Sequence, residues 1–145
     1  EERLVPERVM VLGISIGSGV AAYLAQRYRV GTLLLLSPYT SLSDLVRELP
    51  GLGLLTPFLW YRFPVSEYMA KLDRTCVISA HGRRDDTIPL HHSETLQKVY
   101  SGSGGFTLLA ADDSGHNNVL SMIYRRIEEQ ILRCLERAGG QSSNI

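Results

Sequence analysis

The sequence has no excess of charge of either sign. Fifteen lysine and arginine residues balance fifteen aspartate and glutamate residues over 145 positions, so the formal net charge is zero. A nucleic-acid interface needs a surplus of basic side chains on one face. The basic residues of this chain are instead scattered singly or in pairs, as at Arg83 and Arg84. We therefore expect no nucleic-acid partner.

Uninterrupted apolar runs and a targeting leader are also absent. The most apolar stretch, residues 49–63, is interrupted by two prolines, two glycines and Arg62, which excludes a membrane-spanning helix. The chain does not open with a charged and then apolar leader. We expect no transmembrane segment and a cytoplasmic location, unless a segment ahead of residue 1 carries a targeting signal.

Cysteine is scarce, with Cys76 and Cys134 as the two examples, each among apolar residues. We interpret them as buried free thiols in a reducing compartment. No group of His, Cys and Asp residues shows the spacing of metal ligands along the chain. The sequence therefore predicts neither a metal site nor a cofactor.

Short apolar runs alternate with amphipathic segments along the chain. The runs predict strands over residues 8–14, 32–36, 76–80 and 106–111. Helical periodicity predicts helices over residues 18–28, 41–49, 89–100 and 118–137. Such alternation is typical of an α/β fold, a mostly parallel sheet with helices on both faces. We expect one domain over residues 1–145.

Two further details of the helices can be predicted. Gly31 is placed to end the first helix, as glycine often does. The inward side of the last helix is predicted from apolar residues at spacings of four: Val119, Ile123, Ile127, Ile131 and Leu135.

Two segments depart from this regular alternation. Residues 40–71 have a looser pattern and form a lid-like or irregular excursion, whose apolar part is residues 49–63. An apolar lid would suit an acyl chain or another hydrophobic substrate, and ordinary packing of a short helix explains the same residues equally well. Residues 139–145 are rich in Gly, Ser and Asn, and we expect a frayed tail there.

The first strand leads into the motif Gly13-Ile14-Ser15-Ile16-Gly17. A serine on a tight turn between a strand and a helix exposes its hydroxyl, and small flanking residues, here Gly13 and Gly17, are needed to fit the turn. A phosphate-binding loop would need G-x-G-x-x-G or a Gly-Lys-Ser/Thr ending, and both are missing. We interpret the motif as a nucleophile elbow, with Ser15 as nucleophile and the Ile16 backbone N–H as an oxyanion donor.

A serine nucleophile needs a histidine to relay its proton and a carboxylate to orient that histidine. Residues 81–89 follow the third strand and contain Asp85 and Asp86, and His116 lies in the loop after the fourth strand. From spacing alone either aspartate can be the acid. Asp44, after the second strand, is a third candidate.

The remaining polar residues of these loops have less specific explanations. Asp112 and Asp113 suit a role as turn residues. His116 itself has a surface loop histidine as its alternative. We expect His91 and His92, at the start of a helix, to be exposed, and His81 to shape its loop rather than to titrate in catalysis.

Four segments together resemble a known family: residues 13–21, residues 37–42, His81-Gly82-x-x-Asp85-x-x-Ile88-Pro89, and residues 115–117. They are similar to the α/β-hydrolase superfamily, nearest to its serine-aminopeptidase-like branch, which also contains acyl-protein and lipid thioesterases and esterases. The resemblance covers residues 8–137. It implies a serine hydrolase that cleaves an ester, thioester or amide through an acyl-enzyme.

The resemblance also assigns the residues of the expected site. It places the acid on Asp85 rather than Asp86, and gives the order Ser15, Asp85, His116 that is typical of this fold.

One difference from the family concerns the first strand. Members of the superfamily have further strands and helices before the nucleophile strand, and one of the missing loops supplies a second oxyanion N–H. We therefore expect the carboxyl-terminal portion of the fold, with an unpaired sheet edge that favours self-association. A catalytically silent α/β domain that serves in binding or assembly is the alternative function.

Overall fold

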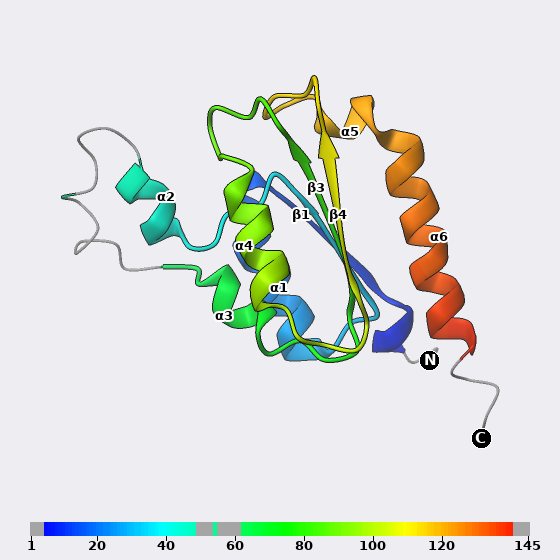
Figure 1. The fold of residues 1–145 in the computed structure, drawn as a ribbon. Helices are drawn as coiled ribbons and strands as arrows, with labels where there is room; N and C mark the ends of the chain where they lie inside the picture. Colours follow the sequence, from blue (N-terminus) through cyan, green and yellow to red (C-terminus); the bar gives the residue numbers. More distant parts are fainter. Residues whose placement is uncertain (1–4, 49–53, 55–61, 141–145) are drawn as a thin grey trace.

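The structure is a computed structural model that describes residues 5–48, 54 and 62–140. Its centre is a four-stranded sheet in the order β1-β2-β3-β4, in which every neighbouring pair is parallel (Figure 1). The strands are β1 (Met10–Ile14), β2 (Thr32–Leu36), β3 (Cys76–Gly82) and β4 (Phe106–Ala111). The predicted α/β fold is confirmed, and each strand lies within two residues of its predicted bounds.

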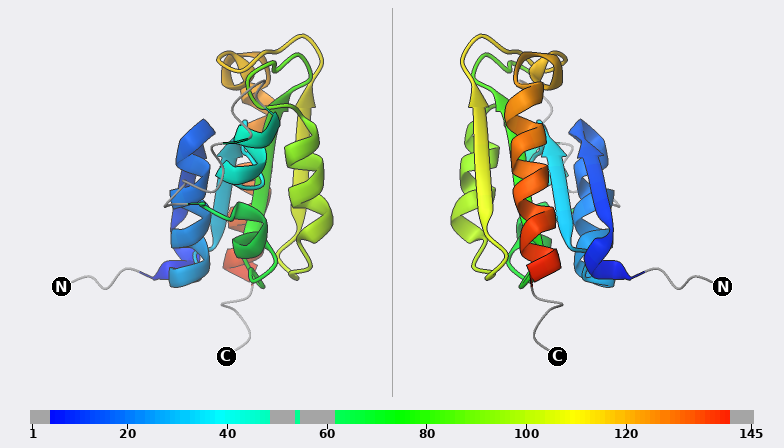
Figure 2. Two further views of the ribbon diagram at one scale, coloured as in Figure 1. Left: turned by 90° about the vertical axis from the view of Figure 1, so that its left-hand side faces the viewer. Right: turned by 90° about the vertical axis from the view of Figure 1, so that its right-hand side faces the viewer.

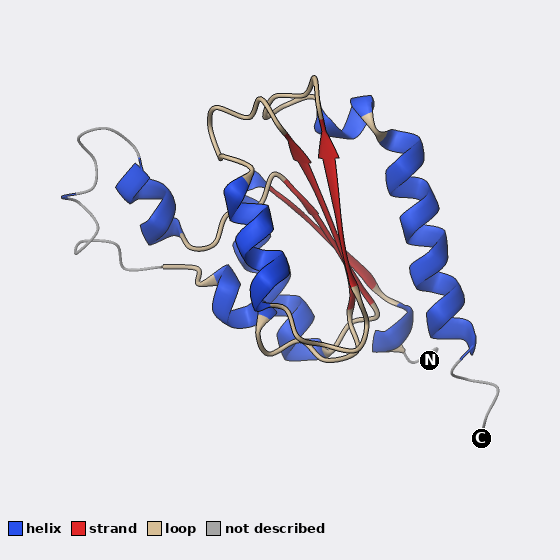
Figure 3. Ribbon diagram, viewed as in Figure 1, coloured by secondary structure: helices blue, strands red, loops and turns tan. Residues whose placement is uncertain are grey.

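Helices cover both faces of the sheet (Figures 2 and 3). They are α1 (Ser18–Tyr28), α2 (Leu42–Glu48), α3 (Val65–Met69), α4 (His91–Val99), α5 (Val119–Met122) and α6 (Tyr124–Gly140). Consecutive strands are neighbours and right-handed crossovers are the rule, so α1, α3 and α4 pack on one face. Since α5 and α6 follow the last strand, they can cover the opposite face.

The alternation of side chains along β2 gives the sheet two separate cores. Leu33 and Leu35 pack with α1, α3 and α4, whereas Leu34 and Leu36 pack with α5 and α6. All five residues of β2 are buried. A central parallel strand covered on both faces needs such a continuous apolar run.

The helix predicted over residues 118–137 is two helices, because the chain leaves the helical conformation at Ile123. In α6, Ile127 is buried as predicted, but Leu135 is exposed and Cys134 is buried in its place. A spacing of four residues exceeds the 3.6 residues of one helical turn, so repeated steps of four drift off the buried face. The prediction for Leu135 was wrong for this reason.

Cys76 and Cys134 form a disulfide rather than the two free thiols expected from the sequence. Cys76 opens β3 and Cys134 lies on α6, and packing of that helix on the sheet brings their Cα atoms to 5.7 Å, within the usual range for a disulfide. Their separation of 58 positions hides this contact from any local pattern.

The first helix ends differently from the prediction. Arg29, with φ of 54°, adopts the left-handed conformation at its carboxyl end, and Gly31 does not. A side chain at Gly31 would overlap the carbonyl group of Glu7. Glycine is therefore required there by close backbone approach.

The two irregular segments fall partly outside the described residues. Of residues 40–71, the structure describes α2, α3 and their flanks, whereas 49–53 and 55–61 lie outside it, including most of the proposed apolar lid. Gly139 and Gly140 belong to α6, and residues 141–145 lie outside. Among the helices described, none is both long and apolar enough to cross a membrane.

Candidate active site

Because the four strands are parallel, their carboxyl ends all lie at the same end of the sheet. The parallel register aligns Ile14 with Leu36, and Leu36 with Ala80. It also aligns Ala80 with Leu109, so the loops after β1, β3 and β4 begin side by side. Ligand and active sites of open α/β sheets form just beyond these carboxyl ends of the strands.

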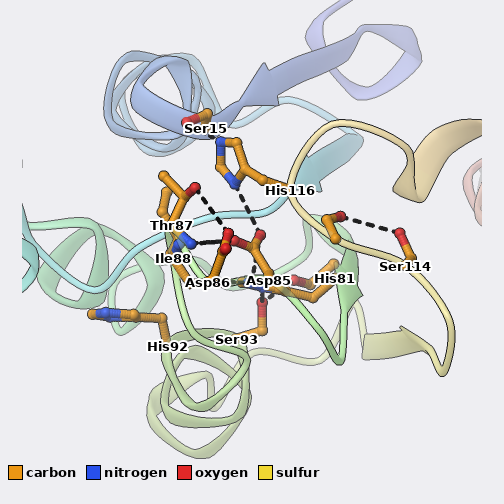
Figure 4. Close-up of polar contacts among 12 residues, drawn as sticks. Ser15, His81, Asp85, Asp86, Thr87, Ile88, His92, Ser93, Ser114 and His116 are labelled. Atoms are coloured by element: carbon orange, nitrogen blue, oxygen red, sulfur yellow. Dashed lines mark hydrogen bonds and ion pairs between the residues drawn. The ribbon is translucent and has the colours of Figure 1, made fainter.

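These loops bring Ser15, Asp85 and His116 into one hydrogen-bonded chain (Figure 4). His116 Nε2 lies 2.9 Å from Ser15 Oγ, across 101 positions of sequence. On the other side of the ring, His116 Nδ1 lies 2.9 Å from Asp85 Oδ2. An ionised carboxylate can only accept, so Nδ1–H donates to Asp85 and Nε2 is left to accept the serine hydroxyl proton.

Ser15 occupies a strained turn between β1 and α1. Its φ of 50° lies in the left-handed region, which residues other than glycine rarely adopt. A Cβ at Gly13 would lie 2.6 Å from the Cβ of Ala21, so this glycine is required for the strand and helix to meet. The sequence also predicted that the turn needs a glycine at position 17. That prediction was wrong, because a Cβ at Gly17 would meet no described atom within 4 Å.

Tyr39 supports the elbow from the loop after β2. Its hydroxyl donates to the carbonyl oxygen of Ile16 at 3.1 Å, and its side chain is fully buried. Burial raises the pKa of Tyr39 to about 12, so it remains a donor. A Cβ at Gly19 would lie 2.5 Å from this hydroxyl, which explains the glycine there. The sequence reasoning missed Tyr39, although it lies in one of the segments that resemble the family.

Asp85 is 6% exposed and its carboxylate has several donors. Oδ1 accepts from the backbone N–H of Thr87 at 3.0 Å and of Ile88 at 2.8 Å, and Oδ2 accepts from His116. Burial alone would raise the pKa of Asp85, but the hydrogen bonds from Ile88 and His116 outweigh it and hold the pKa below its usual value. The carboxylate is therefore ionised at neutral pH.

Each alternative aspartate has other contacts. Asp86 is exposed, and its carboxylate accepts from the Thr87 hydroxyl. Asp44 accepts from Thr40 and Ser41. The turn residues Asp112 and Asp113 form ion pairs with Arg83 and Arg84, both at 2.7 Å. Of these aspartates, the structure joins Asp85 to His116.

The loop that carries Asp85 runs directly beside the loop that carries His116. The N–H groups of Arg83 and Arg84 donate to the carbonyls of Ala111 and Ser114, both at 2.9 Å. A Cβ at Gly82 would overlap the carbonyl oxygen of Ser114. The close approach of the two loops therefore requires glycine at position 82.

The histidines outside the hydrogen-bonded chain occupy different environments. His81 is fully buried at the end of β3, and His91 is exposed as predicted. His92 is 1% exposed, so its predicted exposure was wrong. The amino-terminal turn of α4 packs against the loop after β2, where the Thr40 N–H donates to His92 Nδ1 at 3.2 Å. This contact gives one of the two ring nitrogens a hydrogen-bond partner.

Glu48, His91 and His92 lie close enough together to be considered as metal ligands. Glu48 contacts His91 Nε2 at 2.9 Å and His92 Nε2 at 3.4 Å. The backbone N and the hydroxyl oxygen of Thr40 lie 3.2 and 3.0 Å from His92 Nδ1 on the other side of the ring. Glu48 lies on α2 and the two histidines on α4, so these contacts link the two helices.

No protein-family model matches the chain, and no curated protein matches its sequence. Solved structures do share its fold. An esterase domain from Rhodothermus marinus has 12% identity and a TM-score of 0.63, over 86% of this chain and 59% of that chain. A meta-cleavage product hydrolase from Pseudomonas fluorescens has 17% identity and a TM-score of 0.62, over 92% and 66% respectively.

Acetyl xylan esterase 1 from a Thermoanaerobacterium species has 16% identity and a TM-score of 0.66, over 90% of this chain and 47% of that chain. The chain thus spans about half to two thirds of the length of these structures. At such identities the likeness establishes the fold alone, which is a partial α/β-hydrolase fold. The nearer resemblance to the serine-aminopeptidase-like branch stays a prediction.

Proposed function

We propose that this chain carries the catalytic residues of a serine hydrolase that cleaves an ester, thioester or amide through an acyl-enzyme. The observation that carries the proposal is the continuous chain from Ser15 Oγ through His116 to Asp85, with both contacts at 2.9 Å. This arrangement has the geometry of a nucleophile, a general base and an orienting carboxylate.

Acylation would begin with attack of Ser15 Oγ on the substrate carbonyl carbon, while His116 Nε2 takes the hydroxyl proton. The Ile16 N–H would donate to the oxyanion of the tetrahedral intermediate. As the intermediate collapses, His116 returns the proton to the leaving alcohol, thiol or amine. Water then attacks the acyl-serine with His116 again as base, which releases the acid and restores the Ser15 hydroxyl.

Asp85 would act on His116 rather than on the substrate. Its carboxylate holds the proton on Nδ1, which keeps Nε2 free to accept, and it stabilises the imidazolium formed during attack. Tyr39 would hold the backbone of Ile16, the residue whose N–H is the proposed oxyanion donor, through its hydrogen bond to the Ile16 carbonyl.

For the substrate we propose a small acyl compound, since the structures with the same fold include esterases. A hydrophobic acyl group would suit the apolar residues predicted to form a lid. A cytoplasmic location stays a prediction, and the Cys76–Cys134 disulfide counts against it, because such bonds form mainly in oxidising compartments.

A fluorophosphonate probe tests the nucleophile directly. We expect covalent labelling of the folded chain at Ser15 and complete loss of labelling in Ser15→Ala. Ser121→Ala is the matched control, because its exposed hydroxyl contacts only the Asn118 carbonyl among the described residues. A folded chain that is not labelled, or equal labelling of Ser15→Ala, would contradict the proposal.

The outer edge of β1 supports the second candidate function, binding or assembly. Met10, Leu12 and Ile14 are 43%, 48% and 53% exposed. Within the described residues β1 has a strand neighbour, β2, on one side only. An apolar strand with an open edge favours pairing with another strand. We propose this edge as the self-association surface, and it is compatible with the hydrolase proposal.

A further inference from the structure

A buried chain of polar side chains lies behind the loop that carries Asp85, and it takes no part in the proposed reaction steps. It runs from Ser79 on β3 through Ser93 on α4 to His81, with contacts of 2.9 Å and 2.6 Å. All three residues are fully buried. A buried polar group destabilises the folded state unless it is hydrogen-bonded, so each donor and acceptor of this chain needs a partner.

The carbonyl at the end of this chain fixes the direction of every hydrogen bond. The Ile88 carbonyl oxygen can only accept, so His81 Nε2–H donates to it at 2.7 Å. Burial lowers the pKa of His81, which keeps the ring neutral with a single proton. His81 Nδ1 therefore accepts from the Ser93 hydroxyl, which in turn accepts from Ser79.

Ile88 links His81 to Asp85. Its carbonyl accepts from His81, and its N–H donates to Asp85 Oδ1 at 2.8 Å. His81 precedes the turn that contains Asp85 and Ile88 follows it, so their hydrogen bond closes the base of that turn. His81 Nε2 also lies 3.4 Å from Asp85 Oδ2, the oxygen that binds His116 (Figure 4).

We propose that His81 is a positioning residue, which holds Ile88 and thereby aims the Asp85 carboxylate at His116. Its consequence for catalysis rests on the proposed serine-hydrolase function. His81 contacts Ser93, Ile88 and Asp85, so it acts through Asp85 rather than on the reacting atoms.

Two amide substitutions at position 81 separate the two nitrogens of the ring. The amide group of asparagine reaches the position of Nδ1, so His81→Asn keeps an acceptor for Ser93 and loses the donor to Ile88. The amide of glutamine reaches the position of Nε2, so His81→Gln keeps the donor to Ile88 and loses the acceptor for Ser93. The proposal requires the donor, so His81→Gln should rescue what His81→Asn loses.

His92→Asn is the matched control for burial. His92 is 1% exposed and also starts from a neutral ring on the same side of the sheet, but it binds Thr40 and not the acid loop. Any general cost of replacing a buried histidine should appear in this variant too. Ser93→Ala is a second probe, which removes the donor to His81 Nδ1 without changing the ring.

The first measurement is kcat and KM on a p-nitrophenyl ester. For His81→Asn we expect kcat to fall about 10- to 100-fold with little change in KM, since a displacement of about 1 Å costs on that scale. His81→Gln should restore kcat, and His92→Asn should keep the wild-type kcat and KM. Equal loss in His81→Asn and His92→Asn would overturn the proposal.

Amide hydrogen exchange provides a test that does not depend on activity. In His81→Asn, the protection factors of the Thr87 and Ile88 amides that bind Asp85 should fall at least about tenfold, because the loop opens more easily. In His81→Gln and His92→Asn they should stay protected. Unchanged protection in a folded His81→Asn variant would overturn the proposal, even if the chain had no hydrolase activity. If His81→Asn does not fold, Ser93→Ala should show the same deprotection in weaker form, and its absence would overturn the proposal.

Discussion

The two halves of the candidate site are held in place very differently. The loops of Asp85 and His116 are joined by backbone hydrogen bonds, by close approach at Gly82, and by the chain behind His81. Ser15 instead directly follows β1, a strand that is half exposed and has an open edge within the described residues. The histidine–acid half is thus held by direct contacts between its two loops, whereas the nucleophile half is held by pairing of β1 with β2, by the close approach of Gly13 to α1 and by the Tyr39 contact.

Contacts of different kinds contribute unequally to the stability of the first half. The ion pairs Arg83–Asp112 and Arg84–Asp113 are short, but their side chains are mostly exposed, so each contributes about 0–1 kcal/mol. The backbone hydrogen bonds from Arg83 and Arg84 join the two loops directly, and Gly82 and Ser114 are buried where the loops meet. Close packing, rather than surface charge, therefore sets the geometry between Asp85 and His116.

The largest effect should follow removal of the Asp85 charge. In Asp85→Asn the amide no longer holds the His116 proton on Nδ1, and we expect kcat to fall about 10⁴-fold, as for the equivalent change in a serine protease. Asp86→Asn changes an exposed neighbour and should stay within about threefold of wild type. Ester hydrolysis by both variants measures this. Similar losses in the two variants would show that Asp85 is not the acid.

A second prediction breaks the pairing of the two loops. In Gly82→Ala the new methyl overlaps the Ser114 carbonyl, and we expect the free energy of unfolding to fall by about 3 kcal/mol. Gly17→Ala is the control on the nucleophile side. Gly17 has φ of −65° and open space around it, so stability should be unchanged or rise by up to about 1 kcal/mol. Urea denaturation of both variants checks the difference, and equal destabilisation would contradict it.

The smallest effect on folding is expected at the edge of β1. Leu12→Lys places a charge on an exposed strand, and should change the free energy of unfolding by no more than about 1 kcal/mol. If the edge mediates self-association, the mass in solution should fall to that of a monomer. Leu120→Lys, on α5, is a control of similar exposure. A wild-type chain that is monomeric at high concentration would rule out self-association through this edge.

Local patterns predicted most of the regular structure, because the periodicity of apolar residues is a property of neighbouring positions. They placed the four strands and the turn that carries Ser15. They failed where burial depends on a distant segment. His92 is buried because the Thr40 loop covers it, and Cys76 pairs with Cys134 because α6 packs on β3.

The candidate site shows the same division. Ser15 and His116 were predicted from their loops, whereas spacing alone did not separate Asp85 from Asp86, and it was the resemblance to the family that placed the acid on Asp85. The structure separates them, since Asp85 faces inward to His116 whereas Asp86 is exposed. Adjacent residues of a turn point in different directions. The contact between the loop after β3 and the loop after β4 selects Asp85 as the partner of His116.

Short-range patterns of apolar residues and glycine were enough to predict the α/β architecture and the elbow at Ser15. Contacts between distant segments bring the Asp85 carboxylate to His116, bury His92 and let His81 close the acid loop. These depend on contacts between residues far apart in the chain, such as the 101 positions between Ser15 and His116. Such contacts form when parallel strands align their ends, and no local pattern encodes their distances.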